Sequence, residues 1–463
     1  MRRLYSVFML LLAVALLATS CSKDYRSSIP AGCQALVAVN LVETGKQIGV
    51  ADNKGKQSAL QSIFMVDDVR KTGIDLTSPA YIFETAGGDF GLLAAVGSRS
   101  AVEDWFAALQ DKGLCKELGE KKGYPFFLLK ESFVAALSGD ALMIMGPVVA
   151  TEQSRKQLQM AKYLDAKDGE GVMQSKLFER LETLSGAVTM VARASALPEK
   201  VVAPITLGAP KGTDPSEIIV TAEMNVSDAL LHVNGSVFSF NTAVNDALQK
   251  AANCYRPFRG RYLDKIPATA PFALIANVAG ADYLKLMRTN EALRTMMLGI
   301  NTVIDIDQMI SSVDGDMVVV VPKFLSEKNL AASFIAEAKN SDWTKDVDYW
   351  KKSCPAGTVI SSVGTAALPQ YTMTGSSVTA GFGMANSNTL YISVNNGAKS
   401  AADVMAAPSK GLSSDVAAIA KGKRLCVIAG LDEMVRQKKE LSVVTGMLKP
   451  LFGNVNTLVY TLE

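Results

Sequence analysis

The chain contains a single histidine, His232, and this limits the acid–base chemistry that it could assemble. A Ser-His-Asp triad would have to use His232, yet no G-x-S-x-G turn is present to expose a serine nucleophile. A lone histidine also excludes a histidine-rich metal site. His232 lies in Leu230–Gly235, an apolar stretch that runs into Asn-Gly. We therefore interpret it as a strand histidine, half exposed to solvent, just before a turn.

Two sets of acidic residues could do chemistry of another kind. Asp305 and Asp307 alternate in the run VIDID, and a pair of carboxylates can cleave a glycosidic bond without a histidine. The simpler interpretation is two acids on an exposed strand or at the start of a helix. The loop Asp165–Gly171 carries oxygen ligands suited to calcium, but Lys167 stands where an EF-hand loop requires Asp or Asn. We expect a solvated loop between two helices there.

The segment Tyr255–Tyr262, YRPFRGRY, combines three arginines with three aromatic residues. This combination is typical of sites that bind a polyanion or stack bases. We favour the alternative, a joint between packed modules in which guanidinium groups lie on aromatic rings. The whole chain has 47 Lys and Arg against 45 Asp and Glu, a balance that predicts no nucleic-acid partner. Neither a P-loop nor a strand-linked G-x-G-x-x-G occurs, and we assign no catalytic, cofactor or metal residue.

Cys21 has the clearest chemical context, because it ends an apolar N-terminal run. Met1–Arg3 is basic, Leu4–Leu17 is almost entirely apolar, and Ala18–Ser20 are small residues directly before the cysteine. This is the layout of a secretory signal peptide, which we assign to residues 1–20. The apolar run is shorter than the roughly 20 residues that a comfortable membrane span requires, so a retained anchor helix is the weaker alternative.

The residues Ala18–Cys21 resemble the lipobox of bacterial lipoproteins. The resemblance implies that the Cys21 sulfur receives a diacylglycerol and that the freed amine is acylated as well. Ala18 stands where Leu is usual, and the same bond would suit ordinary signal peptidase, so a plain secreted start is the alternative. One acyl chain attaches a protein only marginally, whereas two or three chains on Cys21 would hold it on a membrane without a spanning helix. Residues 21–28 would then form a lipidated tether.

Lys23 and Asp24 extend this resemblance. A lysine followed by an acid behind a lipidated cysteine is similar to the surface-export signal of Bacteroidota-type lipoproteins, although Tyr25 takes the place of the usual second acid. The resemblance implies a lipid-anchored protein of the bacterial outer membrane, exposed at the cell surface. A periplasm-facing lipoprotein is the alternative.

Composition predicts a well-packed globular protein beyond the signal peptide. Hydrophobic residues make up 49% of the chain and charged residues 20%, values that indicate neither disorder nor a coiled coil. Five cysteines remain after Cys21, an odd number at irregular spacing and without C-x-x-C. We expect most of them to be small buried hydrophobic residues. They are Cys33, Cys115, Cys254, Cys354 and Cys426.

Two parts of the chain resemble each other in a way that indicates internal duplication. Ile29–Val39 (IPAGCQALVAV) returns as Ile266–Ala276 (IPATAPFALIA) with one inserted residue, and both copies predict a turn followed by a buried strand. Gly88–Val96 and Gly315–Val321 both predict a Gly-Asp turn that leads into a central strand.

Further matches follow in the same order along the chain. Apolar residues at helical spacing predict a helix in Val102–Leu109 and another in Leu330–Ala338, each followed by a cysteine. Short strands then pair and a last strand closes each copy. These strands are Phe133–Leu137, Ala141–Met145 and Ala187–Ala192 in the first copy, and Val378–Gly383, Thr389–Val394 and Leu425–Ala429 in the second.

Strands and helices without regular β-α-β alternation predict an α+β fold. We expect two tandem related modules, each a mostly antiparallel sheet with helices packed on one face. The first module would span residues 29–262 and the second, shorter one residues 263–463. Their boundary should fall in Cys254–Lys265, where all periodicity is lost.

The lipobox, the opening Asp24–Ala31 and the apolar run Leu36–Val39 together resemble a Bacteroidota lipoprotein family catalogued only as domain of unknown function four-eight-three-six. The resemblance covers most of the mature chain, and because the family has no assigned activity it implies no catalytic residue. We expect a non-enzymatic, lipid-anchored envelope protein with a structural role or with an envelope protein or glycan as partner. The alternative is a carboxylate-dependent hydrolase acting on envelope or dietary polysaccharide.

The last residues of the chain, Thr457–Leu462, are β-branched and aromatic enough to predict a strand equivalent to Ile218–Ala222. The first module continues with predicted strands at Ala229–Val233 and Ser236–Phe240, whereas the second module ends. The terminal strand would therefore have a free edge, which is a hazard unless it is covered. We expect the first module or another protein to cover it.

Overall fold

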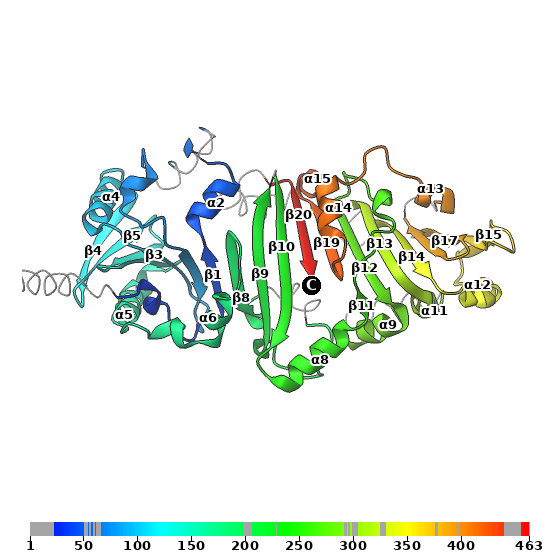
Figure 1. Cartoon of the computed structure of the whole chain (residues 1–463), viewed down its shortest axis with the longest axis horizontal. Coiled ribbons are helices and arrows are strands. Elements are labelled where there is room, and N and C mark those ends of the chain that lie inside the picture. Colours follow the sequence, from blue (N-terminus) through cyan, green and yellow to red (C-terminus); the bar gives the residue numbers. More distant parts are fainter. Residues whose placement is uncertain are drawn as a thin grey trace, which may run out of the picture. The chain divides into compact units, whose positions relative to one another are not determined.

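The computed structural model (Figure 1) describes residues 23–462 except 51–53, 55–56, 59–60, 62–65, 198–205, 228, 291–293, 295–296, 299–303, 325–329, 376–377, 396–398 and 439–454. The predicted signal peptide and Cys21 lie outside the described residues. The described chain divides into two compact units. Unit 1 comprises the described parts of Met1–Leu41 and Gln61–Thr183, and unit 2 those of Val42–Leu60 and Leu184–Glu463. Every helix among the described residues is too short or too polar to span a bilayer.

Unit 1 contains an antiparallel sheet of seven strands in the order β1-β2-β3-β7-β6-β5-β4. The central strands form because apolar residues occupy both faces, as in β6, where four of the five residues are buried. The strands are β1 Ala35–Val39, β2 Ala80–Glu84, β3 Phe90–Ala95, β4 Cys115–Lys121, β5 Tyr124–Leu129, β6 Phe133–Leu137 and β7 Ala141–Gly146.

Helices cover the two faces of this sheet in part. α4 (Arg99–Asp111) buries Val102, Phe106 and Leu109 against strand residues, which confirms the helix predicted there. α5 (Gln153–Leu164) contacts β6 and β7 and buries Met160 and Leu164. The remaining short helices of unit 1 are α6 Lys176–Leu181, η1 Tyr25–Ser28, η2 Val69–Thr72, η3 Ala150–Glu152 and η4 Gly171–Gln174.

Unit 2 contains strands in the order β8-β9-β10-β20-β19-β12-β13-β14-β18-β17-β16-β15. These pairs are antiparallel except β10 with β20, which is parallel. The short β11 pairs with the end of β12. The strands are β8 Val188–Arg193, β9 Ile218–Ser227, β10 Leu230–Ser239, β11 Tyr255–Arg256, β12 Phe272–Ala279, β13 Val313–Phe324, β14 Leu330–Ala338, β15 Val359–Ser362, β16 Gln370–Thr374, β17 Thr379–Asn386, β18 Thr389–Val394, β19 Leu425–Gly430 and β20 Thr457–Leu462.

Helices pack on both faces of the unit 2 sheet, not on one face as we expected. Val404 and Val416 belong to a core with Ile275 on one face of β12, and Met309 and Trp343 belong to a second core on the other face. Strands buried on both sides need apolar residues throughout, and this explains the continuous run MVVVV in β13. The helices are α2 Leu41–Gln47, α8 Thr242–Ala252, α9 Gly280–Thr289, α11 Ile306–Ser312, α12 Val347–Ser353, α13 Ala401–Met405, α14 Ser414–Ala420, α15 Leu431–Gln437, η5 Ala194–Ala196, η6 Pro215–Glu217, η7 Leu263–Lys265 and η8 Asp342–Asp346.

Two local predictions were wrong. Leu330–Ala338, predicted as a helix, is strand β14, because it is buried between β13 and β18. Asn234 and Gly235, predicted as a turn, lie inside the ten-residue strand β10. A side chain at position 235 would meet the ring of Tyr460 on β20, so glycine is required there by packing and not by a turn.

The prediction for the C-terminal strand is confirmed. Thr457–Leu462 forms β20, and β10, a strand of the predicted first module, covers the edge that β19 leaves free. The predicted module boundary at Tyr262 falls inside unit 2, whereas the two compact units divide near Thr183. Compactness and sequence similarity thus divide the chain at different places.

Candidate functional site

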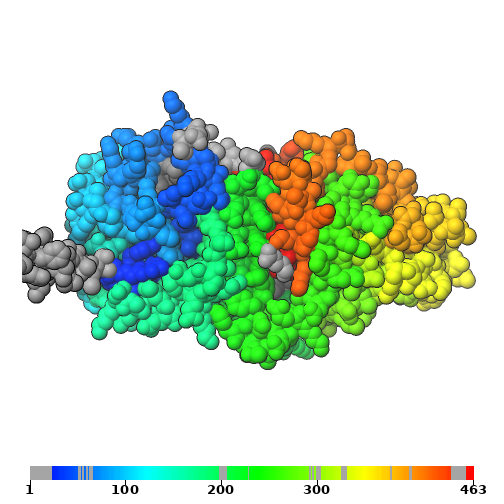
Figure 2. All heavy atoms as spheres, viewed as in Figure 1, coloured from blue at the N-terminus to red at the C-terminus, as the bar shows by residue number. Residues whose placement is uncertain are grey.

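The described chain begins at Lys23, two residues after Cys21, and it is packed against unit 1 from this point. Figure 2 shows these residues in dark blue on the surface of unit 1. We call this region the N-terminal seat. It consists of Lys23, Asp24, Tyr25, Arg26 and Ser27 together with Pro79, Leu164, Asp168, Gly169, Gly171 and Glu182.

Lys23 and Asp24 bind the end of helix α5 and the loop that follows it. The Lys23 ammonium donates to the carbonyl oxygen of Leu164 at 2.7 Å, and the Asp24 N–H donates to Asp168 Oδ1 at 3.0 Å. Leu164 is the last residue of α5, where carbonyl groups lack helical partners and the helix dipole favours a cation. Burial lowers the pKa of Lys23 despite the nearby acids. The first described side chain therefore completes the end of a helix.

Tyr25 and Arg26 hold the next turn. The Tyr25 hydroxyl donates to the carbonyl oxygen of Pro79 at 2.7 Å. The Arg26 guanidinium pairs with Asp24 at 2.5 Å and lies 5.5 Å from the ring centroid of Phe178. Burial alone would raise the pKa of Asp24, but the hydrogen bonds and charge of Arg26 outweigh it and leave that pKa below its usual range.

The seat continues through two buried serines, Ser27 and Ser28. The Gly169 N–H donates to Ser27 Oγ at 3.0 Å, and the Val172 N–H donates to the carbonyl oxygen of Ile29 at 2.8 Å. Gly171 has a φ of +67°, and a side chain there would collide with the backbone of this segment. Residues 23–28, which we predicted as part of a tether, are therefore packed in the fold of unit 1.

The loop Asp165–Gly171, considered above for calcium, uses its oxygens within the protein. Asp165 accepts from Lys122 Nζ and from the Tyr124 hydroxyl, each at 3.1 Å. Glu170 accepts from the Lys167 N–H at 2.8 Å. The loop connects α5 to η4, and it carries the N-terminal segment in place of a metal ligand set.

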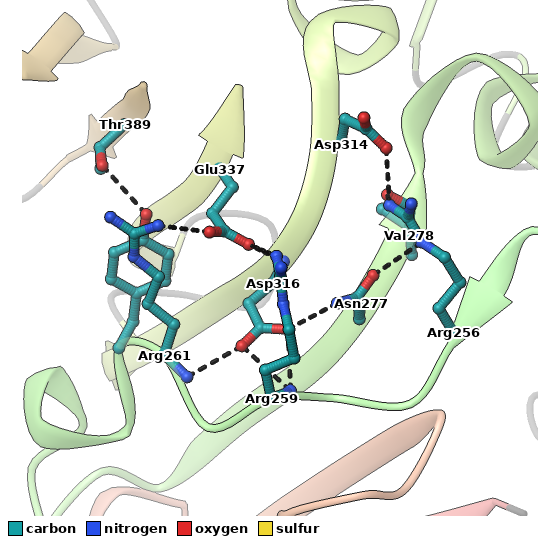
Figure 3. A network of polar contacts seen from close by, with 10 residues as sticks. Arg256, Arg259, Arg261, Asn277, Val278, Asp314, Asp316, Glu337 and Thr389 are labelled. Carbon is teal, nitrogen blue, oxygen red and sulfur yellow. Dashed lines mark hydrogen bonds and ion pairs between the residues drawn. The ribbon is translucent and has the colours of Figure 1, made fainter. Parts of the chain in front are cut away.

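A second group of polar residues surrounds the buried carboxylate of Asp316 on β13 (Figure 3). We call it the arginine network. The N–H groups of Arg259 and Arg261 donate to Asp316 at 3.0 and 2.8 Å, and the Asn277 side-chain amide donates at 2.7 Å. Asp316 is fully buried, so its charge depends on these donors.

Glu337 on β14 binds the two guanidinium groups of the same segment. It accepts from the side chains of Arg259 and Arg261 and from the Asp316 N–H at 2.8 Å. Burial alone would raise the pKa of Glu337, but the Asp316 N–H and the two arginines outweigh it, and the pKa is lowered. Gly315 leaves room for the Glu337 carboxylate, since a Cβ at this position would collide with it.

The rest of the segment is held by Arg256 and Tyr262. Arg256 donates to Asn277 Oδ1, to the carbonyl oxygen of Val278 and to Asp314, at 2.9, 2.8 and 2.7 Å. The Tyr262 ring is buried, its hydroxyl lies 3.0 Å from Thr389 Oγ1, and the Arg261 guanidinium lies 5.4 Å from the ring centroid.

The stacking predicted for this segment is present between Arg261 and Tyr262. The segment lies within unit 2, where it binds β12, β13 and β14. Three acids, Asp314, Asp316 and Glu337, face its three arginines. The charges of these six residues balance, and their contacts hold the segment on the sheet.

The other residues considered for chemistry lie on β10 and α11 of unit 2. His232 lies on β10, half buried, with Nε2 2.9 Å from Thr461 Oγ1 on β20. Asp305 is the N-cap of α11 and accepts from the Gln308 N–H at 2.9 Å, and Asp307 pairs with Arg288 in the first turn. The interpretation of these acids as a helix start is confirmed.

The cysteines behave as buried hydrophobic residues. Cys33, Cys115, Cys254 and Cys426 are buried and Cys354 is half buried, and all five are free thiols. Burial raises the pKa of Cys33 and of Cys426 to about 12, so neither forms a thiolate nucleophile near neutral pH.

The family is identified by comparison with known proteins. A family described as Domain of unknown function (DUF4836) matches residues 47–425. The chain belongs to this family. Its resemblance to lipoproteins stays a prediction, because that resemblance lies in residues before the matched range. No curated protein matches the chain.

Solved structures of TP0453 are similar to part of the DUF4836 chain. Crystal form III shows 12% identity and a TM-score of 0.32 and covers 50% of this chain and 86% of that one. Crystal form I shows 12% identity and a TM-score of 0.30, with 50% and 87% coverage. Crystal form IV shows 12% identity and a TM-score of 0.29, with 44% and 76% coverage. Similarity at this level carries no argument about function.

Proposed function

We propose that this protein is a non-enzymatic, lipid-anchored protein of the bacterial cell envelope. Acyl chains on Cys21 attach it to the outer membrane, and two related α+β modules form a binding or structural surface. The partner is an envelope protein or a glycan. The observation that carries the proposal is the N-terminal seat, which gives Lys23 and Asp24, two and three residues after the predicted lipidation site, a fixed place on the folded protein.

The seat supports an attachment role because it orders a segment that has no other evident use. A plain secreted protein does not need an N-terminus that closes a helix end, yet Lys23 makes this contact with Leu164 only two residues after Cys21. A load applied through a lipid at Cys21 would be transmitted directly to α5. Ser27 and Ser28, which follow in the same segment, are buried, and Ser27 accepts from the Gly169 N–H.

The proposal of two related modules is supported by strand order. The unit 1 order β1-β2-β3-β7-β6-β5-β4 corresponds, strand for strand along the chain, to the unit 2 order β12-β13-β14-β18-β17-β16-β15. The antiparallel pair β8–β9 likewise corresponds to β19–β20. A 3-10 helix precedes Ile29-Pro30 and another precedes Ile266-Pro267, and both isoleucines are fully buried. In this correspondence β3 is equivalent to β14. The Gly-Asp pattern in the sequence had instead paired Gly88–Val96, which contains β3, with Gly315–Val321 in β13.

The hydrolase alternative gains no support from the two acids of α11 or from the two buried acids of the arginine network. Asp305 caps a helix, Asp307 pairs with Arg288, and Asp316 and Glu337 are saturated by donors. A general acid for glycoside cleavage needs a carboxyl with a raised pKa, whereas the pKa of Glu337 is lowered.

Cell fractionation tests the proposal. We expect the wild-type protein in the outer-membrane fraction, released only by detergent, and Cys21→Ala in an unprocessed or soluble form. Ser22→Ala is the matched control and should fractionate like the wild type. A Cys21→Ala protein that is processed to the mature size and still fractionates with the outer membrane would overturn the proposal. Protease digestion of intact cells then distinguishes an outward-facing protein from a periplasm-facing one.

A further inference from the structure

The N-terminal seat restricts how far unit 1 can stand from a membrane, if Cys21 carries acyl chains as proposed above. In the proposed mature protein, which begins at Cys21, only Cys21 and Ser22 precede Lys23. An extended chain spans about 3.5 Å per residue, so Lys23 lies within roughly 10 Å of the acylated residue. Half of the difference in thickness between a whole bilayer and its hydrocarbon core is the polar layer of one leaflet, about 5–8 Å. Lys23 therefore lies no more than a few ångströms beyond the headgroup layer.

Helix α5 lies next to this point, because the carbonyl group of its last residue binds Lys23. Its buried side includes Met160, Ala161 and Leu164. On the opposite side, Arg155, Leu158 and Lys162 are exposed and follow one another at i, i+3 and i+7. These positions lie within one narrow stripe of a helix with 3.6 residues per turn.

The stripe combines an apolar residue with cations, a composition suited to a lipid interface. Leu158 is 53% exposed and Val149, just before η3 and α5, is 67% exposed. Arg155 and Lys162 flank Leu158, and long cationic side chains can bind headgroup phosphates while their stems lie along apolar surface. Nearby acids are already engaged, since Glu152 pairs with Arg155 and Asp165 with Lys122.

We infer that the exposed stripe of α5, Val149 with Arg155, Leu158 and Lys162, lies on the phospholipid surface and fixes the orientation of unit 1 on the membrane. The partner of this stripe is the lipid headgroup layer. The inference rests on the proposed lipidation and adds to it a defined contact face. A lipoprotein with a long tether would have no such face.

A site-directed fluorophore tests this contact. The full-length lipidated protein, with Cys354→Ala to remove the half-buried thiol, is labelled at Leu158→Cys or Lys162→Cys with an environment-sensitive dye and inserted into phospholipid vesicles. Glu103→Cys on α4, exposed and also on unit 1, is the control. Nitroxide headgroup lipids should quench the dye at 158 and 162 several-fold more than at 103. Equal quenching at the three positions would overturn the inference.

A lengthened tether provides the second variant. Six Gly and Ser residues inserted between Ser22 and Lys23 add about 20 Å of reach and leave the seat intact. Quenching at 158 should then fall to the level at 103 although acylation is unchanged, and persistent quenching contradicts the inference. The mass of the N-terminal peptide separates the two proposals. A protein without acyl chains refutes both, whereas an acylated protein with an unquenched dye at 158 refutes only the membrane contact.

Discussion

Lys23 Nζ lies 2.7 Å from the carbonyl oxygen of Leu164, across 141 residues of sequence. This contact joins the start of the described chain to the end of α5. Its neighbour Asp24 binds Asp168 in the loop that follows. The N-terminal segment is therefore an integral part of unit 1. Substitutions of the residues that contact it should change the stability of unit 1.

Gly171→Ala should destabilise unit 1 strongly. The new Cβ would collide with the carbonyl oxygens of Ser27 and Ile29, and the φ of +67° adds strain. A left-handed conformation costs a non-glycine residue about 1–2 kcal/mol, and overpacking adds about 1–3 kcal/mol. Gly169→Ala is the matched control, because its φ is +75° but its Cβ would meet open space. Chemical denaturation should show the larger loss for position 171, and equal losses would contradict the packing of this segment.

Asp316→Ala should cost about 3–5 kcal/mol of unit 2 stability, because it leaves the backbone N–H groups of Arg259 and Arg261 and the Asn277 amide without their acceptor. Asp314→Ala provides the comparison. Asp314 forms an ion pair with Arg256 in which both side chains are more than 40% exposed, and exposed pairs contribute about 0–1 kcal/mol. Thermal denaturation of both variants measures the difference. Similar losses of stability in the two variants would contradict a buried, stabilising role of Asp316 in the arginine network.

Glu337→Gln should change the response of the protein to acid. Because the folded-state pKa of Glu337 is lowered, its contribution to stability is present above the unfolded-state pKa of about 4.3 and is lost as the pH falls through the folded-state value. The variant lacks this contribution at every pH. The difference in melting temperature between wild type and Glu337→Gln should therefore shrink from pH 7 to pH 3. A constant difference would show that Glu337 is not held as a carboxylate by Arg259 and Arg261.

Val459→Ala should cost about 2 kcal/mol, because Val459 is completely buried in β20 between β10 and β19. Thr457→Ala, at the more exposed start of the same strand, should stay within about 0.5 kcal/mol of the wild type. Deletion of residues 457–463 should lower thermal stability further and promote aggregation, since it exposes the edges of two strands. An unchanged melting temperature in the deletion variant would contradict the observed pairing.

Local sequence patterns predicted helices and strands whose packing partners are close in the sequence. They also predicted elements whose two faces differ in polarity. The stripe Val102, Phe106, Leu109 predicted α4 because its other side is polar. β20 was predicted from its β-branched residues, and its need for a cover was deduced from the missing hairpin. β14 was assigned to a helix because a strand buried on both faces is apolar throughout, and periodicity then cannot distinguish the two structures.

The polar contacts could not be predicted, since they join residues that are distant in sequence. Arg259 meets Asp316 across 57 residues and Glu337 across 78. One signal was available, because Asp316 stands immediately before the apolar run MVVVV and a buried acid requires donors. Lys23 and Asp24 gave no such signal of the N-terminal seat. Polar residues that follow a signal peptide are as typical of a free tether as of a packed segment.

The central claim, attachment through a lipid on Cys21, is tested most directly by the mass of the mature N-terminal peptide. Membrane-extracted protein is digested, and the peptide that contains Cys21 is analysed by mass spectrometry. The account predicts a peptide that begins at Cys21 and carries the added mass of a diacylglycerol and an N-linked acyl chain. A peptide with an unmodified Cys21 at its N-terminus would contradict it.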